Sequence, residues 1–400
     1  MLEFWAMNKL TTQVQQYLFI SLGVFIPTSI AISNLIIGLL SLCWILEGSF
    51  KAKFQLIKAS QWMISIFALI FLYGVGMLWG DNHLNAEWQF QRLALLLAFP
   101  ILATIKIDQK TIKYGATAFL ITTFISALAA ILINNNLISP LADYISFIKD
   151  DWEVSAFIKY NYHNVLLALS FTLCMYLIIE NKTRYKNILI LFILVYALSI
   201  FTEIGRAGQV IFNLSAIFYI CYYNYRRKYI LRSLAFFIVL FAFQFVVYKT
   251  TTVYKSRFDV VSNIIKSNGG EGDVKDIRYV FIRESLNKIF EKPFLGHGTG
   301  SFGTIFKNDI DSGHYFDKHT TPHNQYLYVW FELGILGLFV LLMIFYHQIR
   351  ELFKKQDGIH RTLLPLSFMC LMLVDSYFFI FILTIAYIYL YTIYSRYEFE

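Results

Sequence analysis

The chain has 400 residues, of which 58% are hydrophobic and only 15% are charged. Soluble domains carry about 25% charged residues, so this composition excludes an ordinary soluble domain, a disordered chain and a disulfide scaffold. A polytopic membrane protein remains. The formal net charge of +8 suggests an acidic partner, and its meaning depends on where the basic residues lie.

The apolar segments give the expected helices in chain order. A helix needs about 20 apolar residues to cross the bilayer core. Residues 17–46 exceed that length and are interrupted at Pro27, so they predict two short spans. The final apolar segment, 363–394, is interrupted near Asp375 and also predicts two spans. The other predicted spans are 61–79, 92–106, 112–133, 162–180, 187–203, 208–223, 229–248 and 325–346.

These segments predict an all-α polytopic membrane protein with about twelve transmembrane helices. Residues 1–248 are predicted to form a transmembrane bundle of about nine spans, and residues 325–400 to hold about three more. Between them, residues 249–324 form one large external loop that we expect to contain short helices.

The basic residues test this topology, because the cytoplasmic loops of membrane proteins are enriched in Lys and Arg. With a cytoplasmic N-terminus, 19 of the 34 Lys and Arg residues fall in cytoplasmic segments and 4 in short external segments. The other 11 lie in the long external loop, to which the rule does not apply. Both termini are therefore predicted to be cytoplasmic.

Within the external loop, residues 276–291 are predicted to form a helix that Asp276 caps. On such a helix, Arg278 shares a mostly apolar face with Phe281, Ile282, Ser285 and Ile289. An arginine on that face either lies along it or holds an anion at the membrane surface. Arg283 falls on the polar face, where contact with solvent is the simpler interpretation.

Three glycines at alternate positions, Gly296, Gly298 and Gly300, follow this helix. The spacing suits a tight turn that brings backbone amides close to a ligand, and it also occurs in nucleotide-binding loops. Those loops need a preceding strand and a following helix in a cytoplasmic α/β unit, which an external segment lacks. We therefore expect no nucleotide, and two interpretations remain for the glycines: a glycan or phosphate contact, or a structural turn.

Histidines and a further arginine complete the external candidates. His319 and His323 lie on either side of Pro322 rather than on one helix face, which favours a neutral histidine acting as a base over a metal ligand. His323 would lie at the membrane–water boundary. Arg206 lies in a short turn between two spans, where an ion pair with Glu203 and phosphate binding are the alternatives.

The sequence around His323 resembles a known family. His323-Asn324, followed by nine residues and then Gly334-Ile335-Leu336-Gly337, is similar to the H-[NSQ]-x9-G-x-x-G signature of the O-antigen ligase and O-antigen polymerase superfamily. The motifs occupy residues 200–340, and the predicted arrangement of spans with one late external loop extends the resemblance to the whole chain.

The sequence segments around two arginines resemble motifs of the same family less closely. Arg278, followed by residues 293–302, looks like the family's "R…PLxGxGxgsF" segment. Arg206 looks like its earlier arginine, which is usually found between Ser and Gly. Here Gly205 and Ala207 flank it, which is a departure from the family pattern.

The resemblance implies a GT-C-like fold in the bacterial inner membrane, with the active site in the periplasm. It implies a metal-independent inverting glycosyltransferase without a cofactor, whose donor is an undecaprenyl-diphosphate-linked glycan. Carried over by position, His323 would be the general base, and Arg206 and Arg278 would bind the diphosphate. Further residues are supporting candidates: Asn324, Arg283, His319, Gly298 and Gly300.

We predict an O-antigen ligase, which transfers the glycan to lipid A–core. A polymerase would transfer it to a second lipid-linked repeat, and a protein O-oligosaccharyltransferase uses the same donor; both remain alternatives because they share these motifs. A lipid-linked oligosaccharide transporter is less favoured, because mid-span ionisable residues are few, chiefly Glu332 and Asp375, and no repeat is apparent. Most of the positive charge orients helices among membrane lipids, so the external arginines predict a lipid diphosphate rather than nucleic acid as the anionic partner.

Overall fold

The computed structural model describes residues 2–80, 83–141, 155–180, 185–227, 229–251, 255, 277–309 and 321–398. Every element in these residues is a helix, as the composition predicted. The chain forms two compact units. Unit 1 comprises Met1–Gln16, Ile37–Ile107 and Asp273–Ser395, and unit 2 comprises Tyr17–Ile36, Asp108–Gly272 and Arg396–Glu400.

The first two helices are α1 (Leu2–Phe25) and α2 (Ile30–Leu46), and each contains residues of both units. They are separated at Pro27, so the predicted interruption is confirmed. Proline supplies no N–H donor and cannot continue the hydrogen bonding of α1. The Thr28 hydroxyl instead donates to the carbonyl oxygen of Val24, 3.2 Å away, and closes the last turn.

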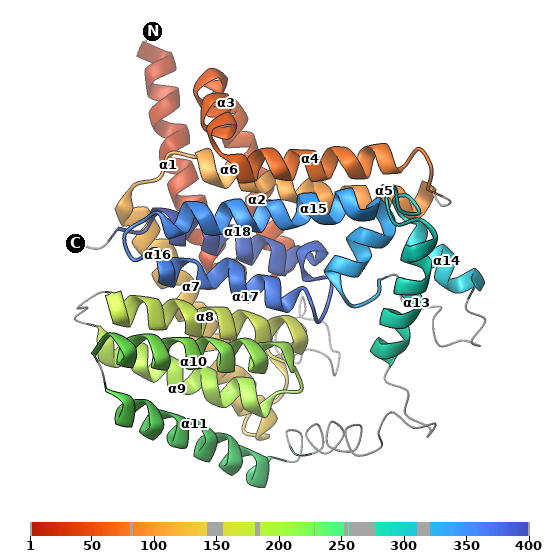
Figure 1. Cartoon of the computed structure of the whole chain (residues 1–400). Coiled ribbons are helices and arrows are strands. Elements are labelled where there is room, and N and C mark those ends of the chain that lie inside the picture. Colours follow the sequence, from red (N-terminus) through yellow and green to blue (C-terminus); the bar gives the residue numbers. More distant parts are fainter. Residues whose placement is uncertain are drawn as a thin grey trace. The chain divides into compact units, whose positions relative to one another are not determined.

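The long helices that the structure describes wholly within unit 2 (Figure 1) are α7 (Gln109–Asn134), α8 (Tyr160–Glu180), α9 (Lys186–Thr202), α10 (Ala207–Arg227) and α11 (Ile230–Thr250). α8 packs against α9 and α10, and α7 packs against α9. A buried hydrogen bond fixes the last pair, since the Tyr196 hydroxyl donates to the carbonyl oxygen of Leu120 at 2.6 Å. The buried centre of this unit therefore lies around α8.

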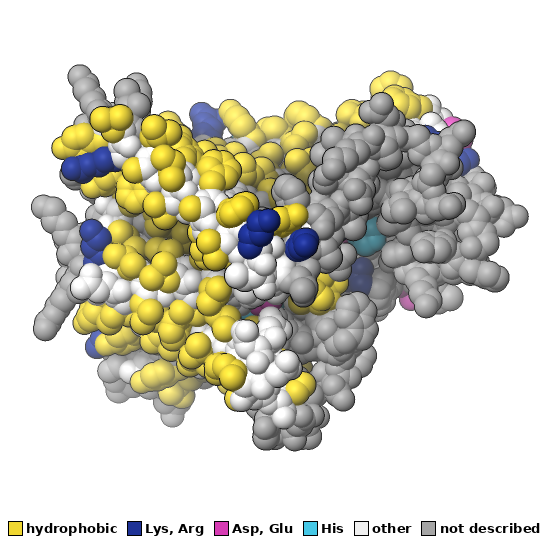
Figure 2. Space-filling view, turned by 90° about the horizontal axis from the view of Figure 1, so that it is seen from below, with side chains coloured by type: hydrophobic (Ala, Val, Ile, Leu, Met, Phe, Trp, Pro, Cys, Tyr) yellow, Lys and Arg dark blue, Asp and Glu magenta, His cyan; other side chains and the backbone are white. Residues whose placement is uncertain are grey.

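α11 differs from its neighbours because its apolar side chains are largely exposed. Leu231, Val239 and Phe241 are 82%, 65% and 65% exposed. In Figure 2, hydrophobic side chains predominate among those that are coloured by type. Such a surface is costly in water and favourable against acyl chains, as expected for a lipid-facing helix.

Unit 1 is built around α15 (Gln325–Phe353), which runs beside α4 (Gln61–Gly76; Figure 1). α18 (Phe381–Arg396) is buried from Ile382 through Tyr394 and forms the centre of the unit. The remaining helices are α3 (Phe50–Ala59), α5 (His83–Ala94), η1 (Leu95–Leu97), α6 (Ala98–Thr104), α13 (Ile277–Glu291), α14 (Ser301–Asp309), α16 (Gly358–Arg361), α17 (Leu363–Leu371) and η3 (Tyr377–Phe379).

Most predicted apolar segments coincide with helices, with two differences. The segment 92–106 is not one helix, because α5 ends at Ala94 and α6 begins only after a 3-10 turn. Pro100 lies in the first turn of α6, where its missing N–H is tolerated. The break near Asp375 is longer than expected, since α17 ends at Leu371 and α18 begins at Phe381.

Within the described residues, four helices are long and apolar enough to cross a membrane, or five if α2 and α3 count as one bent span. α4, α9 and α10 are shorter apolar helices. The protein is therefore a polytopic helical membrane protein, while twelve spans and the sidedness of the loop remain predictions. The Trp62 indole at the start of α4 donates to Glu351 near the end of α15 at 2.8 Å, so these two helix ends lie together.

α15 contains a sharp kink at Gly334, where φ is 66° and ψ is −167°. The left-handed φ value favours glycine. The kink also brings the helix so close to another segment that a Cβ atom at Gly334 would lie 2.0 Å from the carbonyl oxygen of Phe294. The first glycine of the G-x-x-G motif is therefore required by backbone geometry.

We expect Gly334→Ala to lower the stability of unit 1 by about 1–3 kcal/mol, because the added methyl group meets backbone that cannot move independently. The matched control is Gly38→Ala in α2, where a Cβ atom would have no neighbour within 4 Å. Thermal unfolding of the purified protein in detergent measures both variants. Equal melting temperatures would contradict the role assigned to Gly334.

Candidate active site

His323 precedes α15 on a tightly held turn. Its φ of 51° lies in the left-handed region, which is uncommon for a residue other than glycine. The next residue, Asn324, caps α15, because its side-chain oxygen accepts the N–H groups of Tyr326 at 3.0 Å and Leu327 at 3.1 Å. This cap fixes the start of the helix directly after the histidine.

The same turn is bound to the chain between α17 and α18. The Asn324 amide donates to the carbonyl oxygen of Leu373 at 3.2 Å, and the Gln325 N–H donates to that of Met372 at 2.8 Å. As a result, His323 Nδ1 lies 3.1 Å from Asp375 Oδ1. The two side chains are 27% and 18% exposed, so both are partly accessible from outside.

The His323–Asp375 pair is suited to proton transfer. A carboxylate that accepts a hydrogen bond from Nδ1–H places the imidazole lone pair on Nε2, where it can take a proton from a hydroxyl group. Asp375 Oδ1 also accepts the Ser376 N–H at 2.7 Å, which restrains the carboxylate. Sequence reasoning did not identify Asp375 as a partner of His323; the signal was a carboxylate at the break of the last apolar segment.

α13 lies against His323 through Phe281. Phe281, Ser285 and Ile289 are each 0% exposed, whereas Ile282, which the sequence places on the same face, is 40% exposed. The Phe281 ring lies 5.7 Å from the imidazole ring of His323, measured between ring centroids. Arg278 lies on the backbone of α13 one turn before Phe281, and its side chain is outside the described residues.

The other candidate residues of the loop that the structure describes contact partners other than His323. Arg283 is exposed, and its guanidinium group pairs with Glu284 at 2.6 Å, as expected for the polar face. His319 and the predicted cap Asp276 lie outside the described residues. The imidazole of His297 is 2.8 Å from the carbonyl oxygen of Lys288 and stacks on Phe331, so this histidine holds the loop together.

The glycine segment, residues 293–301, pairs with α15 around the kink. The His297 N–H donates to the carbonyl oxygen of Phe331 at 2.8 Å, and the Ile335 N–H donates to that of Pro293 at 2.9 Å. These bonds replace the intrahelical bonds that the kink at Gly334 interrupts. The segment is therefore part of the same folded body as α15.

Glu332 strengthens the pairing from inside the helix. Its backbone oxygen accepts the Gly298 N–H at 2.9 Å, and its buried carboxyl group accepts the Gly300 N–H at 3.0 Å. The Thr299 N–H donates to the carbonyl oxygen of Gly76 in α4 at 3.0 Å. Because these amides donate within the protein, the geometry favours the structural interpretation of Gly298 and Gly300 over ligand contact.

Arg206 lies in unit 2, in the turn between α9 and α10. The two nearby glycines are required by the start of α8, since a Cβ atom at Gly205 would lie 2.7 Å from Cβ of Asn164, and one at Gly208 would lie 2.2 Å from the carbonyl oxygen of Asn164. The Asn164 amide also donates to the carbonyl oxygen of Ile200 at 3.0 Å, near the end of α9. This packing gives a physical reason for small residues around Arg206.

A buried polar cluster supports the same turn. Glu203 Oε1 lies 2.9 Å from His163 Nδ1 and accepts the Ser199 hydroxyl at 2.7 Å. The other ring nitrogen of His163 is 2.9 Å from the Ser126 hydroxyl. All four side chains are nearly inaccessible to solvent, so the cluster is a structural support of the Arg206 turn rather than an open site.

His323 and Arg278 thus lie in unit 1, and Arg206 lies in unit 2. Within unit 1, the structure brings His323 together with Asp375 and the α13 face that follows Arg278. That the two arginines and His323 converge on one ligand remains a prediction.

Comparisons with known proteins address the class directly. Residues 191–342 match the family model described as "O-Antigen ligase". Over 76 residues the chain is 33% identical to a protein of Rickettsia conorii named "Putative polysaccharide ligase", and the matched part covers 18% of each chain. The resemblance to the O-antigen ligase superfamily is thereby confirmed, and the matched family segment contains Arg206, Arg278 and His323.

The buried cluster gives a test of the support under Arg206. We expect His163→Phe to lower the free energy of unfolding by about 3 kcal/mol or more, because the Glu203 carboxylate then remains buried without its partner. The double variant His163→Phe/Glu203→Met removes both polar groups, so its free energy of unfolding should fall less than that of His163→Phe alone. Thermal unfolding in detergent measures His163→Phe, Glu203→Met and the double variant, and a double variant that loses the sum of the two single losses would contradict the coupling.

Proposed function

We propose that this protein is a membrane glycosyltransferase of the ligase type, with its active site at the periplasmic face of the bacterial inner membrane. The observation that carries the proposal is His323, held by Asp375 on a partly exposed turn next to α13. The family described as O-antigen ligase supports the same function, because its match includes His323.

The proposed reaction moves a glycan from undecaprenyl diphosphate to an acceptor hydroxyl group in one displacement. The hydroxyl oxygen attacks the anomeric carbon and forms the new glycosidic bond. The bond from that carbon to the diphosphate oxygen breaks, and its electron pair leaves with the diphosphate. His323 takes the proton of the hydroxyl group on Nε2, and Asp375 stabilises the resulting imidazolium. The anomeric configuration is inverted.

The proposed diphosphate ligands are Arg206 and Arg278. A guanidinium group donates a planar fork of hydrogen bonds that fits phosphate oxygens and keeps its charge at any relevant pH. Two such groups would stabilise the negative charge that grows on the leaving diphosphate. The reaction proposed here needs neither a metal ion nor a further cofactor.

Lipid A–core is the acceptor that we propose, which makes the protein an O-antigen ligase. The description of the matching family and the name of the Rickettsia relative favour ligation. A second lipid-linked repeat or a protein hydroxyl group would make it a polymerase or a protein O-oligosaccharyltransferase with the same catalytic residues. Asn324 supports any of these reactions by fixing the turn of His323.

Transport of a lipid-linked glycan is less well supported. Transporters place ionisable groups at substrate and ion sites within the membrane. The two carboxylates that suggested such a role have other partners here. Glu332 accepts the Gly300 N–H inside unit 1, and Asp375 lies at His323.

The reaction can be tested with purified protein, an undecaprenyl-diphosphate glycan and one acceptor at a time, with EDTA present throughout. We expect transfer to lipid A–core and release of undecaprenyl diphosphate, detected by mass spectrometry. Under the same conditions, His323→Asn should lower the rate by about 10²- to 10⁴-fold, because asparagine tolerates a left-handed backbone but cannot act as the base. Asp375→Asn should lower it by at least about 10-fold, because the imidazole is no longer oriented.

The matched controls are His347→Asn in α15 and Asp357→Asn in the turn before α16, which lie outside the proposed site. Both should keep wild-type rates. Melting temperatures show whether each variant is folded. Wild-type transfer by folded His323→Asn would remove this residue from the role of base, and loss of transfer in EDTA would exclude the metal-independent mechanism.

The arginines of α13 offer an internal comparison. We expect Arg278→Gln to lower kcat/KM for the lipid-linked donor by about 10²-fold or more, because a diphosphate ligand is lost. Arg283→Gln on the same helix should have little effect, because that side chain is exposed and paired with Glu284. Arg206→Gln should resemble Arg278→Gln. Equal effects of the Arg278 and Arg283 substitutions would contradict the assignment.

A further inference from the structure

The chain turns sharply after α2 in a manner that the proposed reaction does not explain. α2 and α3 differ in direction by 115° across a short break. The break contains Gly48 and Ser49, with φ values of 66° and 54°. α2 has 17 residues and is roughly 25 Å long at 1.5 Å per residue, enough to cross most of a bilayer core. With α2 along the membrane normal, a helix at 115° to it would lie close to the membrane plane.

α3 has the residue pattern of a helix at the membrane surface. Lys53 and Ile57 are buried against unit 1, and α3 packs on α4 and α6. Beside that buried stripe, Phe50 and Phe54 are 44% and 55% exposed. Three lysines in ten residues argue against a position inside the bilayer core.

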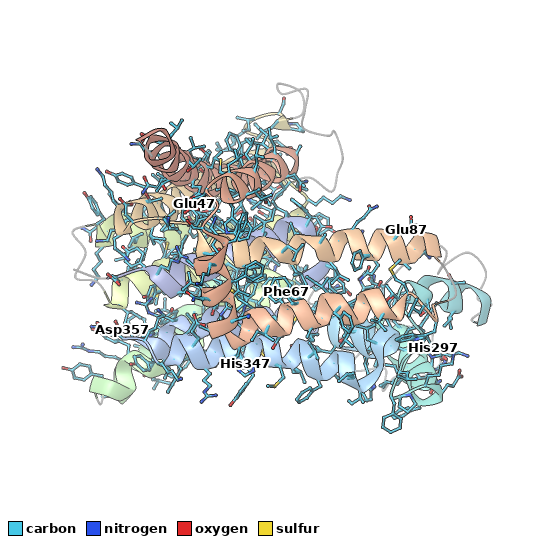
Figure 3. The ribbon with its side chains drawn as sticks, turned by 90° about the horizontal axis from the view of Figure 1, so that it is seen from above. Glu47, Phe67, Glu87, His297, His347 and Asp357 are labelled. Carbon is cyan, nitrogen blue, oxygen red and sulfur yellow. The ribbon has the colours of Figure 1, made fainter. Side chains whose placement is uncertain are left out.

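A buried ion pair holds the turn. Lys53 Nζ lies 3.1 Å from Glu47 Oε2 and 4.5 Å from the centre of the Trp44 ring. Glu47 is 1% exposed. Its carboxylate also forms a salt bridge with Lys106 at 2.8 Å and accepts a hydrogen bond from the Gln15 amide at 3.3 Å. Figure 3 shows Glu47 where the chain passes from α2 into α3. Two lysines therefore share one carboxylate, which leaves surplus positive charge at this end of unit 1.

The surface lysines of α3 add to that charge. Lys51 and Lys58 are exposed. At about 100° per residue they lie next to Phe54 on the helix surface, at the border between its apolar and polar sides. Lysines at such a border extend their ammonium groups to the headgroup level while aromatic rings enter the acyl region.

We propose that α3 lies in the membrane interface, with Phe50 and Phe54 among acyl chains and with Lys51 and Lys58 bound to anionic phospholipid headgroups. The charge of the two lysines complements such lipids, and the exposed rings beside them fit an acyl surface better than a soluble polar partner. The buried Lys53–Glu47 pair fixes the angle at which α3 meets the membrane. This placement does not depend on glycan transfer.

The position of α3 can be tested in the full-length protein. A photo-crosslinking phenylalanine analogue replaces Phe54 on the apolar side or Gln55 on the polar side, and the protein is placed in nanodiscs of phosphatidylcholine and phosphatidylglycerol. We expect lipid adducts by mass spectrometry from position 54 and few from position 55. Equal adducts from both positions, or cross-links from position 54 to another protein in native membranes, would overturn the proposal.

The lysines are tested by phosphatidylglycerol binding in native mass spectrometry. Lys51→Gln/Lys58→Gln should weaken binding by about 30-fold at low salt, and the effect should shrink at high salt. Lys51→Arg/Lys58→Arg keeps the charge and should retain wild-type binding. Unchanged binding in the glutamine variant would overturn the proposal. Transfer activity of the same variants measures the proposed function separately.

Discussion

The pairing of the glycine segment with the kinked α15 is the constraint on which the rest of the candidate site depends. It joins the C-terminal end of α13 to the helix that begins immediately after His323. Gly334 permits the approach, and the backbone and carboxyl oxygens of Glu332 accept N–H groups of the glycine segment. These bonds hold the end of α13 beside α15, and the Phe281 ring of α13 lies 5.7 Å from the imidazole ring of His323.

The chemically useful groups lie where apolar helices are interrupted. His323 precedes α15, Asp375 lies between α17 and α18, and Arg206 lies between α9 and α10. Inside a bilayer every backbone polar group needs a partner, so irregular chain is tolerated where protein or water supplies one. The Asn324 cap, the Asn164 amide and the Asp375 carboxylate supply such partners here. At His323, the same bonds that satisfy the backbone also fix the turn that carries the candidate base.

Much of the helical organisation could be predicted from the sequence, because long apolar segments and proline leave strong local signals. The break at Pro27 is confirmed, and three of the four residues predicted to share a face with Arg278 on α13 are buried. The division of residues 92–106 into α5, η1 and α6 was not predicted, because composition hardly distinguishes a continuous apolar helix from a kinked one.

The site was predictable only in part. His323 could be identified by its motif, but its partner lies 52 positions away. Only the folded turn shows that Asp375 meets Nδ1. The glycines were ambiguous in the sequence, because a turn that cradles a ligand and a turn that packs on a helix need the same residue. The acceptors of their amides resolve this ambiguity in favour of packing. For Arg206, the close approach of Asn164 explains the neighbouring glycines, which spacing alone did not.

The stereochemistry of transfer tests the central claim most directly. A single displacement with His323 as the base requires the acceptor hydroxyl group to attack opposite the departing diphosphate. The anomeric configuration of the bond that the purified protein forms from a donor of known configuration can be assigned by NMR. We predict inversion at the anomeric carbon. Retention would require either two displacements or attack from the face that the diphosphate leaves, and would contradict the role assigned to His323 and Asp375.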